Sequence, residues 1–177
     1  MCFLDLASER YSVRKYQQIP VEQEKIDSIL RVAQVAPSGH NAQSARVLVI
    51  NEESALEKLR RCTVCHYHAP LIFLVGYDRT VCWQREYDGK LSGEIDASII
   101  CTHMMLEAFD LGLGSVWVMN FNPYKMRQEF HIPDQIEPVA LLLAGYPAEG
   151  VKPTTRHSTY QPIEELCKYN DFNPQAL

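Results

Sequence analysis

Two arginines and a serine alternate near the start of the sequence, at Arg10, Ser12 and Arg14. The segment is expected to be extended from about residue 11, and side chains two positions apart in an extended chain point to the same side. Guanidinium groups give planar, bidentate donors to phosphate oxygens, so these side chains would form a phosphate clamp. A solvated strand face is the alternative, and the spacing by itself does not exclude it.

Two further stretches combine polar groups with accessible backbone. Residues 37–41 read Pro-Ser-Gly-His-Asn, which would bring a hydroxyl, backbone amides and a side-chain amide to a ligand. The same residue types favour an ordinary turn that ends a helix. Residues 117–120 read Trp-Val-Met-Asn and would either offer backbone N–H groups to a ligand edge or serve core packing alone.

A C-x-x-C-H sequence at Cys62, Cys65 and His66 matches the pattern of c-type haem attachment. No second C-x-x-C or H-x₃-H follows at the spacing of a zinc finger. We therefore favour packing or incidental thiols, keep a haem or zinc protein as an alternative, and expect no metal site. No Ser-His-Asp or Cys-His order for nucleophilic catalysis stands out.

Composition narrows the class of protein. The chain has 177 residues, enough for one domain with a sizeable core. Its net charge of −5 argues against a nucleic-acid surface, which normally needs a basic patch. Residues 1–6 have neither a basic region nor a long apolar stretch, so we expect a cytoplasmic protein whose six cysteines are reduced thiols.

The central element is a helix that begins after Gly93 and leads into a strand at residues 115–119. Apolar residues fall on two of its faces, which predicts a helix that is buried on most sides. Its narrow polar stripe consists of Asp96, His103, Glu107 and Asp110. These residues interrupt the apolar run too often for a membrane span. His103 would act as a base or, as we favour, as a hydrogen-bonded structural histidine.

The remaining pattern predicts a layered α+β domain. We expect helices near residues 3–7, 20–36, 52–61 and 123–130, a helical turn at 162–167, and strands at 47–50, 71–75 and 138–144. The strands lack strict alternation, which indicates a sheet covered on both faces. Residues 78–92 form an irregular connection with Trp83, Arg85 and Tyr87. No G-x-G-x-x-G follows a strand, so a Rossmann dinucleotide site is not supported.

Taken together, four blocks resemble the FMN-dependent nitroreductase family, in a short, single-domain form. They are residues 9–16, 36–43, 96–117 and 142–147, in the order of the family, and they span almost the whole chain. The chain departs from the family pattern in two places. Ser44-Ala45 follows Gln43 where Pro-Trp is usual, and Met119-Asn120 follows the central strand where a glycine is common.

The resemblance implies an α+β fold with a central mixed, mainly antiparallel sheet covered by helices, an α-β-α sandwich. It also implies a single FMN-binding domain over residues 1–177 and an interlocked homodimer with one FMN at each of two interface sites. The C-terminal tail, residues 147–177, would pack on the partner subunit. No membrane or nucleic-acid partner is expected.

The same resemblance assigns the cofactor contacts. The phosphate and ribityl chain would be held by Arg10, Ser12 and Arg14 with the backbone of Tyr11. Arg156 is the best-placed candidate for the arginine that usually completes the phosphate site. The flavin ring would be contacted from the partner subunit by Pro37, Ser38 and Asn41, and near N5 and O4 by the backbone of Val118, Met119 and Asn120.

The implied activity is reduction of nitroaromatic, quinone or related small acceptors by NADH or NADPH, through ping-pong hydride transfer at the bound flavin. The flavin carries the chemistry, so no catalytic side chain is expected. A specialised reductive enzyme, such as a dehalogenase or an ene-type reductase, is one alternative, and a flavin-binding protein without significant turnover is another. The sequence names neither the acceptor nor the preferred nucleotide.

Overall fold

A four-stranded sheet forms the centre of the computed structural model, which describes residues 2–172. The strands lie in the order β1-β2-β4-β3, and every neighbouring pair is antiparallel. Their bounds are β1 Ala45–Ile50, β2 Leu71–Asp78, β3 Gly114–Val118 and β4 Ile136–Gly145. One parallel bridge joins Ser12 to Ser115 at the β3 edge. The prediction of a mixed, mainly antiparallel sheet is confirmed.

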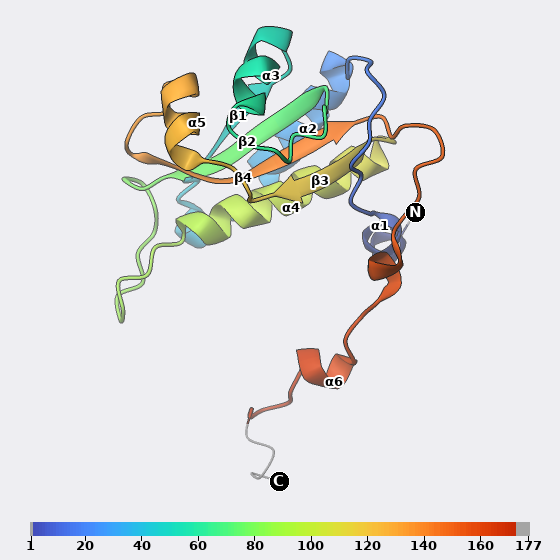
Figure 1. Ribbon diagram of the computed structural model, residues 1–177. Helices are drawn as coiled ribbons and strands as arrows, with labels where there is room; N and C mark the ends of the chain where they lie inside the picture. The colour runs from blue at the N-terminus through green and yellow to red at the C-terminus, as the bar shows by residue number, and fades with distance from the viewer. Residues whose placement is uncertain (1, 173–177) are drawn as a thin grey trace.

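Helices cover both faces of this sheet (Figure 1). One face carries α2 (Gln23–Val35) and α4 (Gly93–Asp110), and the other carries α3 (Glu53–Arg60) and α5 (Pro123–Phe130). Successive residues of β2 point into two separate cores: Phe73 packs on the α2 and α4 side, and Ile72 on the α3 and α5 side. The sandwich expected from the continuous apolar strands is therefore present.

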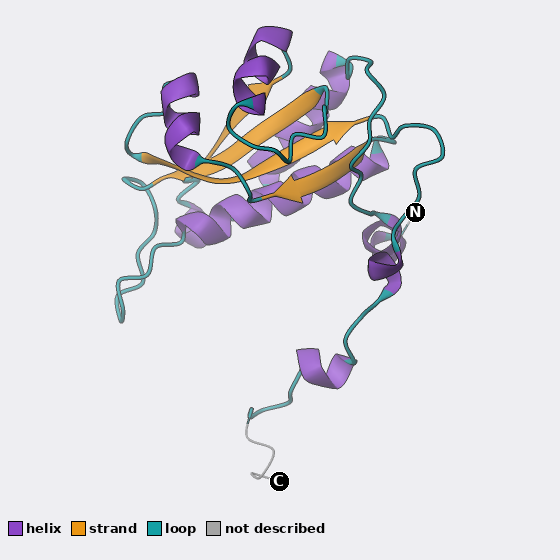
Figure 2. Cartoon of the chain, viewed as in Figure 1, coloured by secondary structure: helices purple, strands orange, loops and turns teal. Residues whose placement is uncertain are grey.

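Four short elements lie outside the two main helical layers. They are α1 (Phe3–Glu9), η1 (Gly39–Asn41), η2 (Thr155–Ser158) and α6 (Ile163–Leu166). Two segments leave the body of the molecule, as Figure 2 shows: residues 79–92, here called the arm, and residues 159–172, here called the tail. Both carry exposed aromatic rings, with Tyr87 97% exposed in the arm and Tyr169 87% exposed in the tail.

Two boundaries differ from the sequence prediction by three residues, more than the other strand and helix ends do. Helix α2 begins at Gln23 and not near Pro20, because Val21 is buried in the core and Glu22 caps the helix in an extended conformation. Strand β2 continues to Asp78, beyond the predicted end at residue 75, because an irregularity between Val75 and Gly76 lets its pairing with β4 resume.

The central helix α4 is enclosed on most but not all sides within one chain. Ala97, Ile100 and Met104 are buried against the sheet, but Ile95 on another face is 50% exposed. Four of its 18 residues are exposed, so the helix is buried or half-buried along most of its surface and leaves one face open in the single chain. Asp96, from the polar stripe, is only 1% exposed. None of the helices in the described part of the chain combines the length and the apolar character needed to cross a membrane.

Candidate functional site

The segment that carries the alternating arginines is extended, as predicted, and lies along the edge of β3. Its backbone is fixed there by Val13, whose N–H donates to the carbonyl of Ser115 at 2.9 Å. The hydroxyl of Tyr16 donates to the Val13 carbonyl at 2.7 Å. Burial raises the pKa of Tyr16 well above its ordinary value, so this hydroxyl remains a neutral donor. The segment is therefore held on both sides of Arg14.

A glycine makes this close approach possible. A Cβ at Gly114 would lie 2.5 Å from Cγ2 of Val13 and 3.0 Å from Cγ of Pro147. Real side chains do not pack at the shorter of these distances, so any larger residue would push the segment away from β3. Gly114 thus lets the arginine segment lie directly against β3.

Arg10, Ser12 and Arg14 line one cavity with the predicted C-terminal arginine, Arg156. This cavity, here called the arginine pocket, has a volume of about 580 Å³. Its lining residues are Arg10, Tyr11, Ser12, Arg14, Thr154, Thr155, Arg156 and His157. The two parts of the wall touch where the rings of Tyr11 and His157 meet edge to face, with centroids 6.2 Å apart.

The donors of the arginine pocket fit a phosphate group. The lining combines three arginines with serine and threonine, which carry hydroxyl groups, and none of the lining residues is acidic. Guanidinium pairs with phosphate in a planar, charge-assisted and often bidentate geometry, and hydroxyls add further donors. The solvated-face alternative is therefore less favoured than the clamp.

The backbone predicted to approach the flavin ring follows directly at the end of β3. Val118 is buried, whereas Met119 is 70% exposed and Asn120 is exposed. Met119 is four residues from Ser115, or about 13 Å along the strand. The exposed end of β3 therefore lies along the same sheet edge as the arginine pocket, farther from the phosphate donors.

The C-x-x-C-H segment braces this end of β3. The Thr63 hydroxyl donates to the Asn120 carbonyl at 2.5 Å, and the Asn120 side-chain amide lies 3.6 Å from Sγ of Cys65. Cys62 is buried, its Sγ lies 3.4 Å from the Lys58 carbonyl, and burial raises the pKa of its thiol. This arrangement favours the packing interpretation.

The metal alternative receives no geometric support. Nδ1 of His66 accepts a hydrogen bond from the backbone N–H of His68 at 3.1 Å, and burial lowers the pKa of His66. Between residues 2 and 172, no group of three or more His, Cys, Asp or Glu side chains is arranged to hold a metal ion.

His103, weighed above as a possible base, has a structural contact. Its Nδ1 lies 2.8 Å from the carbonyl of Ile99, and a carbonyl only accepts, so this nitrogen carries a proton. Glu107 accepts instead from the hydroxyl of Ser28 at 2.6 Å. The structural interpretation of His103 is favoured.

Residues 37–44, here called the flavin loop after their predicted role, have an unusual backbone. His40, Asn41 and Gln43 have φ values of 50°, 56° and 50°, in the left-handed region that costs free energy for residues other than glycine. The Ser38 hydroxyl accepts from the N–H of Gln43 at 3.0 Å and closes the turn. Such a conformation persists only where the surroundings hold it.

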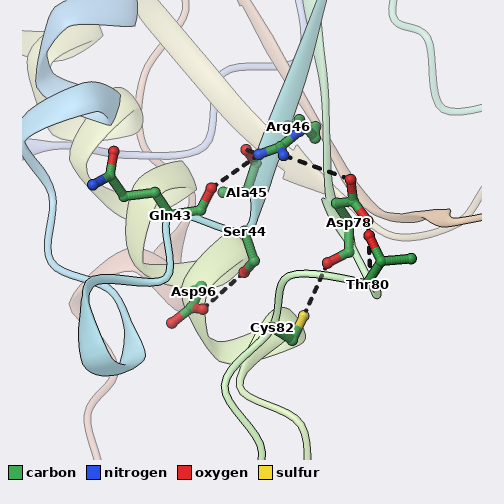
Figure 3. Close-up of polar contacts among 8 residues, drawn as sticks. All are labelled: Gln43, Ser44, Ala45, Arg46, Asp78, Thr80, Cys82 and Asp96. Carbon is green, nitrogen blue, oxygen red and sulfur yellow. Dashed lines mark hydrogen bonds and ion pairs between the residues drawn. The ribbon is translucent and has the colours of Figure 1, made fainter.

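A buried carboxyl group, which the sequence analysis missed, holds the flavin loop. Asp96 accepts from the N–H of Gly39 at 2.9 Å, from the Ser44 hydroxyl at 2.8 Å and from the Ser92 hydroxyl at 2.8 Å. We call these residues the aspartate clamp. Figure 3 shows Ser44 pointing toward Asp96. The sequence did contain a signal for this role, because Asp96 is an acidic residue in a mainly apolar helix. The sequence analysis placed it only in the polar stripe of that helix.

The two sets of predicted flavin contacts lie at opposite ends of α4. The arginine pocket is next to Gly114, just past the C-terminus of the helix, whereas Asp96 holds the flavin loop at its N-terminus. The 18 residues of α4 span about 27 Å. A single chain therefore does not bring Pro37, Ser38 and Asn41 to its own arginine pocket.

The fold and site define an α+β protein with a phosphate-type pocket at the edge of an antiparallel sheet. A family model described as "Nitroreductase family" matches residues 7–65 and 64–146. The chain is 31% identical over 162 residues to a putative NADH dehydrogenase/NAD(P)H nitroreductase of Methanothermobacter thermautotrophicus, covering 88% of this chain and 82% of that one. It is 25% identical to an FMN reductase [NAD(P)H] of Bacillus subtilis, over 80% of this chain and 64% of the relative.

A solved structure also resembles this chain. A nitroreductase family protein from Clostridium difficile 630 superposes with a TM-score of 0.91 at 44% identity, covering 97% of this chain and 99% of the other. This chain belongs to the nitroreductase family. The fold class and the family resemblance predicted from the sequence are both confirmed.

Proposed function

We propose that this chain passes electrons from NADH or NADPH, through bound FMN, to nitroaromatic compounds, quinones or related small acceptors. Its enzyme class and cofactor are those of its family: it is an FMN-dependent NAD(P)H oxidoreductase. The proposal extends to a cytoplasmic homodimer whose six cysteines stay as thiols.

The arginine pocket is the observation that carries the proposal. Three guanidinium groups offer charge-assisted donors to a phosphate, and FMN carries a phosphate at the end of its ribityl chain, whereas riboflavin has none. In the proposal, Arg10, Ser12, Arg14 and Arg156 hold the phosphate, and the backbone at Tyr11 contacts the ribityl chain.

The ring is placed by backbone and not by charged side chains. We propose that Val118, Met119 and Asn120 present backbone groups to the ring edge, with Asn120 kept in place by Thr63. FMN, when bound, supplies the two-electron chemistry. The chain positions the ring, excludes water from one of its faces, and directs backbone N–H dipoles at the edge where negative charge develops on reduction.

A second copy of the chain completes the site in this proposal. Asp96 holds the loop of Pro37, Ser38 and Asn41 at the N-terminal end of α4, and the arginine pocket of the same chain lies past the C-terminal end of this helix, which is about 27 Å long. The half-exposed face of α4 around Ile95 offers apolar surface for the partner, and the chain from residue 147 onward would pack on it. Sedimentation at micromolar concentration should give a dimer, and a monodisperse monomer that still binds FMN would contradict this.

An anaerobic titration tests the activity. Protein reconstituted with FMN should be yellow, should lose its oxidised-flavin absorption on addition of NADH or NADPH, and should regain it on addition of a nitroaromatic compound or a quinone. A yellow protein that is inert to both nucleotides would instead be a flavin-binding protein without significant turnover. Reduced protein that turns over only halogenated or activated-alkene acceptors would be the specialised reductive enzyme.

A further inference from the structure

The aspartate clamp joins two parts of the chain that are far apart in sequence. Gly39 and Ser44 belong to the flavin loop, and Ser92 lies at the base of the arm, directly before α4. Asp96 is 1% exposed and Ser44 is fully buried, so water does not compete for these hydrogen bonds. One carboxyl group therefore fixes both ends of the strained turn to the start of α4.

Asp78, the last residue of β2, contacts both the flavin loop and the arm. The N–H of Asp78 donates to the Ser44 carbonyl at 2.8 Å. The carboxylate of Asp78 lies 3.5 Å from the guanidinium of Arg46 in β1, and Figure 3 shows these two side chains paired. Hydrogen bonds from Thr80 hold the pKa of Asp78 below its ordinary value, with a smaller contribution from Arg46. The flavin loop, through the Ser44 carbonyl, and the arm, through Thr80, are thus both bound to Asp78.

An aromatic pair adds to this connection. The ring of Trp83, in the arm, stacks on the ring of His40, in the flavin loop, with centroids 5.1 Å apart and planes 6° from parallel. A Cβ at Gly39 would lie 3.0 Å from Cβ of Ser92 and 3.5 Å from Cβ of Trp83, so the loop packs tightly against the arm. The arm, which the sequence left without a role, therefore braces the loop.

We propose that Asp96 is a positioning residue for flavin binding, acting through Gly39, Ser44 and Ser92 to present the flavin loop to the ring. The assignment rests on the proposed function, in which Pro37, Ser38 and Asn41 contact the ring held by the partner subunit. The side chain of Asp96 does not reach the flavin; it keeps the loop in a left-handed conformation that the loop would otherwise leave.

The ring-side role predicts how flavin binding responds to loss of the clamp. Ser44→Ala and Ser92→Ala each remove one hydroxyl that donates to Asp96. In both variants the Kd for FMN and the Kd for riboflavin should rise by the same factor. We expect that factor to be about tenfold, because one hydrogen bond to a carboxylate is lost. Asp96→Ala should have a larger effect, and Asp96→Asn a smaller one, because an amide oxygen still accepts from Gly39 and the amide N–H₂ can donate to a serine oxygen.

Three controls separate positioning from general damage. Ser54→Ala and Asp110→Ala make the same chemical changes at exposed positions on α3 and α4. Gly112→Ala introduces a side chain where φ is +78° and nothing lies within 4 Å, so it lowers stability without touching the loop. All three should keep wild-type affinity for both flavins.

The experiment is a titration of folded apo-protein with each flavin, with visible circular dichroism of the saturated complex and a thermal unfolding curve for every variant. Equal weakening of both flavins and an altered visible spectrum in the clamp variants, with neither change in Gly112→Ala, would support the assignment. Wild-type affinities and spectra in folded Ser44→Ala and Ser92→Ala, or weakening of FMN alone, would overturn it. If Arg10→Ala still separates FMN from riboflavin in that case, the proposed function survives. A wild-type protein that binds neither flavin would defeat both.

Discussion

Polar groups are held in place differently in the arginine pocket and in the flavin loop. In the pocket, charged side chains project from a regular extended segment, and that segment is held by main-chain hydrogen bonds to β3. In the loop, the backbone itself is irregular, and a buried side chain on another element holds it. In our proposal, side chains of the pocket bind the flavin phosphate, whereas the loop contacts the flavin ring and is positioned by Asp96, which does not itself touch the flavin.

This difference predicts which substitutions the arginine pocket and the flavin loop should tolerate. The pocket depends on steric access of the segment to β3 and on the number of cations, so it should fail when the segment is displaced or a charge is removed. The loop and the end of β3 depend on hydrogen bonds to neighbouring elements, so they should fail in smaller steps as those bonds are removed.

The largest effect is expected from Gly114→Ala. Its Cβ would clash with Val13 and displace the segment that carries Arg10 and Arg14, at a cost of about 1–3 kcal/mol in the free energy of unfolding. Loss of two phosphate contacts should also raise the Kd for FMN by about a hundredfold. Thermal unfolding and flavin titration measure the two effects.

Gly112→Ala is the matched control for Gly114→Ala, because its cost of about 1–2 kcal/mol arises from the left-handed backbone and not from a clash. It should leave the Kd for FMN unchanged in the folded protein. Similar FMN affinities for the two variants would mean that close contact between the segment and β3 does not shape the pocket.

A smaller effect is expected from Thr63→Val at the ring end. The change removes the hydroxyl that donates to the Asn120 carbonyl and accepts from the N–H of Cys65, and one such bond contributes about 1 kcal/mol. The Kd values for FMN and riboflavin should both rise about fivefold. A selective loss of FMN binding would contradict the assignment of Asn120 to the ring end.

The smallest effect is expected from the double replacement Cys62→Ser and Cys65→Ser. Serine keeps a small acceptor beside Asn120 and a donor near the Lys58 carbonyl, and no thiol chemistry enters the proposed reaction. Flavin content and turnover should stay within about twofold of wild type. Loss of a stoichiometric metal or haem in this variant would restore the alternative interpretation of the C-x-x-C-H sequence.

The same difference between the arginine pocket and the flavin loop explains why the sequence predicts one better than the other. Arg10, Ser12 and Arg14 were recognisable because an extended segment converts a spacing of two into a shared side, and the segment is indeed extended. Strands and helices were placed to within a few residues because their apolar periodicity is local. The C-terminal arginine came from the family resemblance, and the structure places it in the same cavity.

The aspartate clamp was not predictable in this way. Asp96 lies 57 residues from Gly39 and 52 from Ser44 in sequence, and only the packing of α4 against the sheet brings them together. A polar residue on an apolar helix has the same local pattern whether it is solvated or buried. Thr63 was overlooked because the neighbouring cysteines and histidine suggested metal binding, whereas its hydroxyl supports a strand end far along the chain.

The most direct test of the central claim compares FMN with riboflavin, which lacks the phosphate. In titrations of folded apo-protein, Arg10→Ala should weaken FMN binding by about tenfold to a hundredfold, as loss of one charge-assisted contact predicts, and leave riboflavin binding nearly unchanged. Arg14→Ala and Arg156→Ala should behave similarly, and Lys15→Ala, outside the lining of the pocket, should have little effect. Equal weakening of both flavins by Arg10→Ala, or a larger effect from Lys15→Ala than from Arg10→Ala, would contradict the assignment of the arginine pocket to the phosphate of FMN.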